Sequence, residues 1–127
     1  MITRSLEDII GTERDVFWGN GQSRRFLIEE DNMGYSVTET IINAGTTSLL
    51  EYKNHMEACY CIAGEGEVKT TEDGKVHPIK PGTIYALDKN DEHYLTAYSE
   101  MKLVCVFTPA LKGSESHSLN DDGSSHY

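Results

Sequence analysis

The sequence predicts an all-β protein, and three observations lead to that fold class. Between Arg25 and Phe107 the chain runs in short segments rich in Val, Ile, Tyr, Thr and Phe, which favour strands. Sequences typical of tight turns, such as Glu72-Asp-Gly74, separate these segments. The length of 127 residues suits one domain, which can bury a core without disulfides or a structural metal. Closely spaced hairpins in one such domain favour a sandwich or a small jelly-roll barrel.

The elements follow in chain order. Ser5 to Gly11 predicts a short helix, because Ser5 is a good N-cap, acidic residues follow it and Gly11 can end the helix. Nine strands are then predicted: Arg25–Ile28, Tyr35–Ile42, Thr47–Tyr52, Ala58–Ala63, Glu65–Thr71, Lys75–Ile79, Thr83–Leu87, His93–Ala97 and Met101–Phe107.

A single domain, residues 1–127, is the expected organisation. It has an N-terminal helix and loop over residues 1–24, a β-barrel over residues 25–111 and a polar tail over residues 112–127. The tail is rich in Ser, Gly, Asn and Asp and has little apolar area to bury, so we expect a flexible tail or a lid.

Composition narrows the partners and the compartment. Eleven Lys and Arg against 21 Asp and Glu give a net charge of −10, which disfavours nucleic acids and anionic membranes. The start of the chain lacks the apolar run of a signal peptide, and nowhere do 18 apolar residues follow one another, so a cytoplasmic location is predicted. Cys59, Cys61 and Cys105 are expected to stay reduced. Cys59-x-Cys61 without a second pair is a weak zinc signal, and we interpret both as buried strand residues.

Two spacings carry most of the functional information. Glu57 is followed after six residues by Gly64, and Gly82 is followed after ten residues by His93. Both spacings resemble the two metal-binding motifs of the cupin superfamily, whose members fold as jelly-roll barrels.

The second motif departs from that pattern at Asp88 and Asn90, where Pro and Gly are usual. The first lacks the His-x-His that usually precedes the Glu. The sequence there reads Glu51-Tyr52-Lys53, and His55 stands out of register.

Because two of the usual histidines are missing, a metal would need a third ligand. Tyr85 is a candidate, since its strand parity can direct it into the barrel and a bound cation can ionise a phenol. Glu57, Tyr85 and His93 would offer two anionic oxygens and one imidazole nitrogen, a set that suits ferrous iron (Fe²⁺) or another divalent metal. The alternative is a rim tyrosine, a solvated histidine and a surface carboxylate.

Most of the chain, from Met1 to about Gly123, resembles the ectoine synthase family within the cupins. The segments Tyr52–Glu57 and Pro78–Lys89 are the most specific to it. The resemblance implies a cupin barrel, usually a homodimer, with iron at Glu57, Tyr85 and His93. It also implies cyclisation of N-γ-acetyl-L-2,4-diaminobutyrate to ectoine, a compatible solute, with loss of water.

The resemblance further assigns site residues. Catalytic roles fall on Tyr52, His55, Glu115 and His117, and substrate contacts on Arg25, Thr40 and Cys105. Trp18 is a further candidate for a substrate contact. Glu115 and His117 lie in the tail and resemble a general base and proton shuttle that close over the substrate. Arg25 suits a substrate carboxylate, with a surface salt bridge as the alternative. Cys105 is expected to pack at the cavity wall, and substrate contact remains open for it.

One departure from the family concerns an aromatic residue. The family commonly has Trp where this chain has Gly21, and Trp18 lies three residues upstream. Trp18 either replaces that aromatic wall or packs in a loop.

Two other functions compete with a cyclising hydro-lyase. A metal-free or metal-sensing cupin binding module would explain the incomplete histidine set but leaves Glu115 and His117 without a role. An iron dioxygenase generally needs more histidine ligands than this chain offers.

Overall fold

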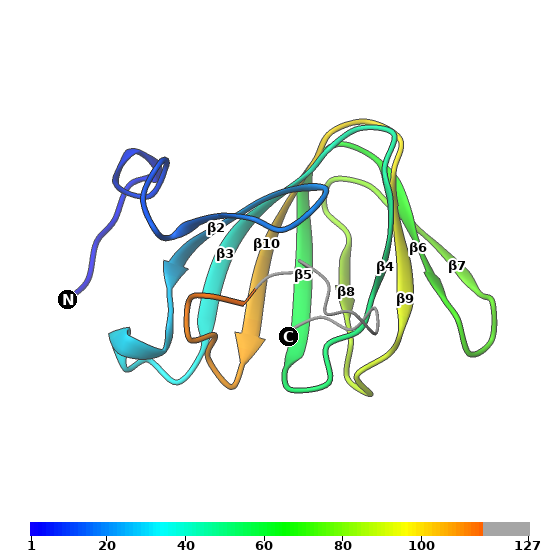
Figure 1. Ribbon diagram of the computed structural model, residues 1–127. Helices are drawn as coiled ribbons and strands as arrows, with labels where there is room; N and C mark the ends of the chain where they lie inside the picture. The colour runs from blue at the N-terminus through cyan, green and yellow to red at the C-terminus, as the bar shows by residue number, and fades with distance from the viewer. Residues whose placement is uncertain (116–127) are drawn as a thin grey trace.

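The computed structural model describes residues 1–115, whose strands form two antiparallel sheets that face each other (Figure 1). The six-stranded sheet has the order β1 (Asp15–Phe17), β2 (Gly21–Leu27), β3 (Ser36–Ile42), β10 (Met101–Thr108), β5 (Met56–Ala63) and β8 (Ile84–Ala86). The four-stranded sheet has the order β4 (Thr47–Leu50), β9 (His93–Ala97), β6 (Gly66–Thr70) and β7 (Val76–Ile79). One apolar core lies between the sheets. The predicted all-β fold is confirmed.

The N-terminal prediction needs correction. The expected helix is a single 3-10 turn, Leu6–Asp8, in which the Asp8 carboxylate accepts a hydrogen bond from the Ser5 backbone N–H at 2.8 Å. So short a segment forms too few backbone hydrogen bonds to offset the cost of helix nucleation. The expected loop before Arg25 contains β1 and the first half of β2, which pair as a hairpin. No helix in residues 1–115 is long and apolar enough to cross a membrane.

Strand alternation directs two polar rows into the barrel. On β5, Glu57, Cys59 and Cys61 are buried while their neighbours face outward or lie partly exposed. On β10, which pairs with β5, Cys105 lies opposite Cys59 and Phe107 opposite Glu57. Directly opposed residues share one face of an antiparallel pair, so these side chains meet in the interior.

The segment after β10 folds back along the barrel. The Leu111 carbonyl accepts a hydrogen bond from the Glu29 N–H, and the Leu111 N–H donates to the Ser36 hydroxyl, both at 2.7 Å. The described chain ends at Glu115, which is buried. The expected flexible tail therefore begins as an ordered segment, while His117 lies outside the described residues.

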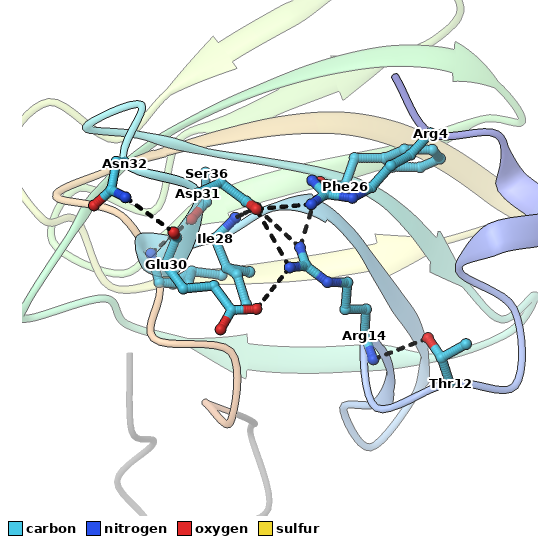
Figure 2. A network of polar contacts seen from close by, with 10 residues as sticks. Arg4, Thr12, Arg14, Phe26, Ile28, Glu30, Asp31, Asn32 and Ser36 are labelled. Atoms are coloured by element: carbon cyan, nitrogen blue, oxygen red, sulfur yellow. Dashed lines mark hydrogen bonds and ion pairs between the residues drawn. The ribbon is translucent and has the colours of Figure 1, made fainter. Parts of the chain in front are cut away.

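Two arginines attach the N-terminal segment to the barrel around Asp31, the last residue of the 3-10 turn Glu29–Asp31 (Figure 2). Arg4 and Arg14 approach its two carboxylate oxygens at 2.8 and 3.0 Å, and both also donate to the Phe26 carbonyl. Burial alone would raise the pKa of Asp31, but hydrogen bonds from Arg14, Arg4 and the Ile28 N–H hold that pKa well below its usual range.

Candidate active site

A cavity between the sheets gathers residues from both of them. Three quarters of its lining is apolar, aromatic or sulfur-containing, and hydroxyl and carboxylate groups supply the rest. The lining residues are Trp18, Ser23, Thr40, Leu50, Tyr52, Glu57, Cys59, Tyr85, Leu95, Leu103, Cys105 and Phe107. A mostly apolar cavity with a few convergent polar groups is typical of a small-molecule site.

The three predicted metal ligands come from three strands. Glu57 lies on β5, Tyr85 on the adjacent β8, and His93 begins β9 of the facing sheet. The Tyr85 and His93 rings lie 6.3 Å apart between centroids. Within the described chain, Glu57 Oε1 and His93 Nε2 are buried without a hydrogen-bond partner.

The second ring nitrogen of His93 explains how the imidazole is oriented. His93 Nδ1 lies 2.9 Å from the Asp91 carbonyl oxygen, which can only accept, so Nδ1 carries the proton. Nε2 then presents a lone pair toward the interior, the arrangement that metal-binding histidines use.

Burial dominates the electrostatics of this set. It raises the pKa of Glu57 well above its usual range, and nearby Cys105 raises it further. Burial likewise raises the pKa of Tyr85 and lowers the pKa of His93. All three shifts disfavour the charged forms, and a cation among the three groups would favour the anionic carboxylate and phenolate. Two buried ligand atoms without hydrogen-bond partners, next to the phenol of Tyr85, therefore fit a divalent metal.

Aromatic contacts and one asparagine hold Tyr52 in the cavity. The Tyr52 ring lies 5.9 Å from that of His93 and 5.7 Å, edge-on, from that of Phe107. Asn90 donates hydrogen bonds to the carbonyls of Tyr52 at 2.8 Å and of His55 at 3.0 Å. Asn90 thus fixes the loop that carries both predicted catalytic side chains.

A second polar cluster joins Arg25, His55 and Glu115. Arg25 is fully buried, donates to the Ser23 hydroxyl and to the Glu115 carbonyl, and places Nη1 3.8 Å from Glu115 Oε1. His55 Nε2 lies 3.8 Å from Glu115 Oε2, while its Nδ1 lies 2.7 Å from the Pro109 carbonyl. Arg25 is therefore a buried residue that contacts Glu115 of the tail, and it does not form a surface salt bridge.

Backbone N–H groups just before Glu115 in the chain bind its carboxylate. It accepts hydrogen bonds from the N–H groups of Lys112 at 2.8 Å and Gly113 at 2.9 Å. Burial alone would raise the pKa of Glu115, but these bonds and the Arg25 charge lower it. Glu115 is consequently ionised at neutral pH.

Trp18 forms part of the cavity wall, so it is no loosely packed loop residue. Its indole is 4% exposed and donates from Nε1 to the Ile41 carbonyl at 3.1 Å. A Cβ on Gly21 would overlap that carbonyl and come within 3.1 Å of Nε1. Trp18 can therefore hold this position because Gly21 has no side chain.

The predicted residues thus form two groups, and His117 belongs to the undescribed part. Of the predicted residues, six line the cavity: Trp18, Thr40, Tyr52, Glu57, Tyr85 and Cys105. The His93 ring lies next to two of them, 5.9 Å from that of Tyr52 and 6.3 Å from that of Tyr85. Arg25, His55 and Glu115 form the second cluster. Phe107 connects the groups, since its ring lies 5.7 Å from Tyr52 and 6.2 Å from His55.

Sequence reasoning missed Phe107, Asn90 and the cavity position of Cys59. Phe107 and Cys59 could have been found from strand parity, because they alternate with exposed neighbours in step with Cys105 and Glu57.

Comparison with known proteins points to one family. The model of a family described as ectoine synthase matches residues 1–126. An L-ectoine synthase from Halalkalibacterium halodurans is 57% identical over 91% of this chain and 89% of its own. One from Oceanobacillus iheyensis is 54% identical over 97% and 94%.

Solved structures show the same likeness. The crystal structure of ectoine synthase from P. lautus superposes with a TM-score of 0.86 and 49% identity, over 90% of this chain and 82% of that one. An RmlC-like cupin from Shewanella frigidimarina, 18% identical, reaches 0.64 over 79% and 86%, which identifies the cupin fold.

Proposed function

This chain belongs to the ectoine synthase family and carries out the ectoine synthase reaction, and we propose that it does so with a divalent metal held by Glu57, Tyr85 and His93. The reaction closes N-γ-acetyl-L-2,4-diaminobutyrate into ectoine with loss of water. The metal we propose is ferrous iron.

One observation carries the proposed metal site. Glu57 Oε1 and His93 Nε2 are buried, and neither has a hydrogen-bond partner among residues 1–115. An unpaired buried polar atom costs about 1–3 kcal/mol, so each of these two atoms calls for a partner, which a bound metal would supply. Tyr85 adds a third donor from the strand paired with β5.

Ring closure sets requirements that the site residues can meet. The α-amine must lose a proton and attack the acetamide carbon, and the resulting hydroxyl must leave as water. A divalent metal at the three ligands would act as a Lewis acid on the acetamide carbonyl. The cavity walls bend the flexible substrate so that its amine and amide meet, which lowers the entropic part of the barrier.

Proton transfer falls to the cluster beside the cavity. Glu115 is ionised and lies 3.8 Å from His55, so this pair can accept a proton from the amine and pass it on. Tyr52 is placed within the cavity to donate a hydrogen bond to the departing oxygen. His117, from the tail, is assigned the shuttle that returns the proton to the leaving hydroxyl.

Substrate orientation falls to four residues. Arg25 offers its buried guanidinium to the substrate carboxylate, for which the bidentate geometry of arginine is suited. Trp18 and Thr40 line the cavity together with Ser23, the hydrogen-bond partner of Arg25. Cys105 lines the same cavity and offers a small side chain to the substrate.

The non-catalytic or metal-sensing binding module is not favoured. Relatives at 50–57% identity over more than nine tenths of this chain share the name of an enzyme. The incomplete histidine set is thus compatible with catalysis, with Tyr85 as the ligand that replaces the missing imidazoles.

Metal content tests the ligand assignment without relying on turnover. Wild-type protein loaded anaerobically with Fe²⁺ is expected to retain about one iron per chain after desalting, and Tyr85→Phe and His93→Ala should retain far less. Tyr94→Phe, on the same strand as His93 but exposed, serves as the control. Full iron retention in both ligand variants would contradict the assignment.

We also propose a homodimer, and the outer face of the larger sheet supports it. Exposed apolar side chains gather on the neighbouring strands β5, β8 and β10: Met56, Tyr60, Ile62, Ile84 and Val106. Sheet faces exposed to water are usually polar, so such a patch indicates an interface with a second copy. Ile84→Lys is expected to shift the mass measured by light scattering from dimer to monomer, and an unchanged mass would contradict this.

A cytoplasmic location is the remaining part of the proposal. All three cysteines are free, and Cys59 and Cys105 lie close enough to react without being bonded. Unbonded neighbouring thiols suit a reducing compartment.

A further inference from the structure

We propose that Glu57, Cys59 and Cys105 form a second metal site, selective for a thiophilic divalent cation such as Zn²⁺ or Cd²⁺. It would share Glu57 with the iron ligands, so the two ions exclude each other. The mutual exclusion of the two ions depends on the proposed iron site. Binding at the thiophilic site does not depend on it.

The geometry of the two thiols comes from the sheet. Cys59 and Cys105 are directly opposed on β5 and β10, and their Sγ atoms lie 3.5 Å apart. The two sulfurs and a Glu57 carboxylate oxygen all lie within 4.8 Å of one another. Tetrahedral zinc with Zn–S bonds of about 2.3 Å places two sulfurs about 3.8 Å apart, so the strands need hardly move.

The surroundings of the two thiols favour ion binding over a role in packing alone. Each of these cysteines is 1% exposed, and both line the cavity between the sheets. Glu57 Oε1 has no hydrogen-bond partner in the described chain and is the oxygen available to a cation. A cavity water or the neighbouring Tyr85 hydroxyl would complete four ligands.

Donor chemistry separates the two sites. Two sulfurs and one carboxylate select zinc or cadmium, while a carboxylate, a phenolate and an imidazole suit iron. An ion bound by the thiols would draw Glu57 away from Tyr85 and His93. The expected consequence is inhibition of the enzyme by thiophilic cations, relieved by added Fe²⁺.

Cys61 provides a matched control on the same strand. It is buried like Cys59 and has the same parity, but its thiol lies 3.4 Å from the Ala63 carbonyl and 3.6 Å from that of Gly64. It is not part of the three-residue group.

The test is an anaerobic titration of reduced, metal-free protein with Cd²⁺, followed by the ultraviolet thiolate-to-cadmium absorbance. Wild type and Cys61→Ala should bind one Cd²⁺ with this absorbance. Cys59→Ala and Cys105→Ala should bind at least about 100-fold more weakly and lose the absorbance. Cys59→Ser, which nearly preserves volume, repeats the test should the alanine variant unfold.

Two further variants separate this site from the iron site. His93→Ala should keep the cadmium absorbance while losing iron, and Cys59→Ala should keep iron while losing cadmium. No absorbance in the wild type, loss of absorbance in Cys61→Ala, or its survival in Cys59→Ala would overturn the thiophilic site. Failure of iron to bind the wild type while cadmium still binds would instead count against the proposed cofactor.

Discussion

Arg25 and Glu115, ninety residues apart, meet in the interior with Arg25 Nη1 3.8 Å from Glu115 Oε1. This contact joins strand β2 to the first residues of the tail. It also gives a fully buried guanidinium a carboxylate partner, without which its burial would be strongly unfavourable.

Glu115→Gln is the variant that separates charge from shape at this contact. Loss of the negative charge should lower the free energy of unfolding by about 1–3 kcal/mol, because Arg25 loses a charged partner. It should also lower kcat by about 10²–10⁴-fold, because the proposed base is removed. Chemical denaturation and steady-state kinetics measure the two effects, with exposed Glu100→Gln as the control. A kcat within a factor of two of wild type would remove Glu115 from the mechanism.

Gly21→Ala should disturb the only tryptophan of the chain. The added Cβ meets the Ile41 carbonyl that Trp18 bonds, so the indole must move and the strand must shift. We expect a red-shifted Trp18 emission, a lower Tm and a higher KM. Gly45→Ala is the control, because Gly45 has a positive φ of 76° but open space around it. Backbone strain in Gly45→Ala should lower Tm without moving the Trp18 emission. An unchanged Trp18 emission in Gly21→Ala, or an equal red shift in Gly45→Ala, would contradict the assigned contact.

Asn90→Gly tests whether the hydrogen bonds from the Asn90 side chain hold the Tyr52–His55 loop in position. Glycine tolerates the left-handed φ of 53° but cannot donate to the two loop carbonyls. A fall in kcat/KM of about tenfold is expected, since each lost hydrogen bond contributes about 1 kcal/mol to the loop position. Asn32→Gly, at the other left-handed asparagine and on the surface, should leave kcat/KM unchanged. If both variants behave alike, the loop does not depend on Asn90.

Asp31 predicts an acid-dependent part of the stability. Its pKa is depressed in the folded protein, so it stabilises the fold above the unfolded pKa of about 3.9. That contribution disappears as pH falls through the folded pKa. Asp31→Asn should therefore lose about 3 kcal/mol at pH 7, and the difference from wild type should shrink on acidification. Urea unfolding at pH 7 and pH 3 measures this, and a difference independent of pH would contradict it.

The barrel and the burial of Glu57, Tyr85 and His93 were predictable because spacing and strand parity both act locally. The interval from Gly82 to His93 places a turn, a short strand and a loop before β9, and the structure has that order. Asn90 stands where the motif usually has Gly and still adopts the left-handed conformation that position needs. Asn90 therefore meets the backbone requirement of a position where the motif usually has Gly.

The N-terminal hairpin and the thiol pair were not predictable by the same reasoning. Strand β2 directs Ser23 and Arg25 inward, which masks the usual alternation of apolar and polar residues. Arg25 is tolerated there because the tail supplies Glu115, a partner that only the tertiary structure reveals. Likewise, the pairing of Cys59 with Cys105 depends on the register of two strands far apart in sequence.

The most direct test of the central claim is proton NMR of the purified protein with N-γ-acetyl-L-2,4-diaminobutyrate under anaerobic conditions. One sample contains Fe²⁺ and the other a chelator. The account predicts ectoine signals in the iron sample and none with the chelator, with Tyr85→Phe silent in both. Ectoine formed at the same rate in both samples would contradict the metal site at Glu57, Tyr85 and His93.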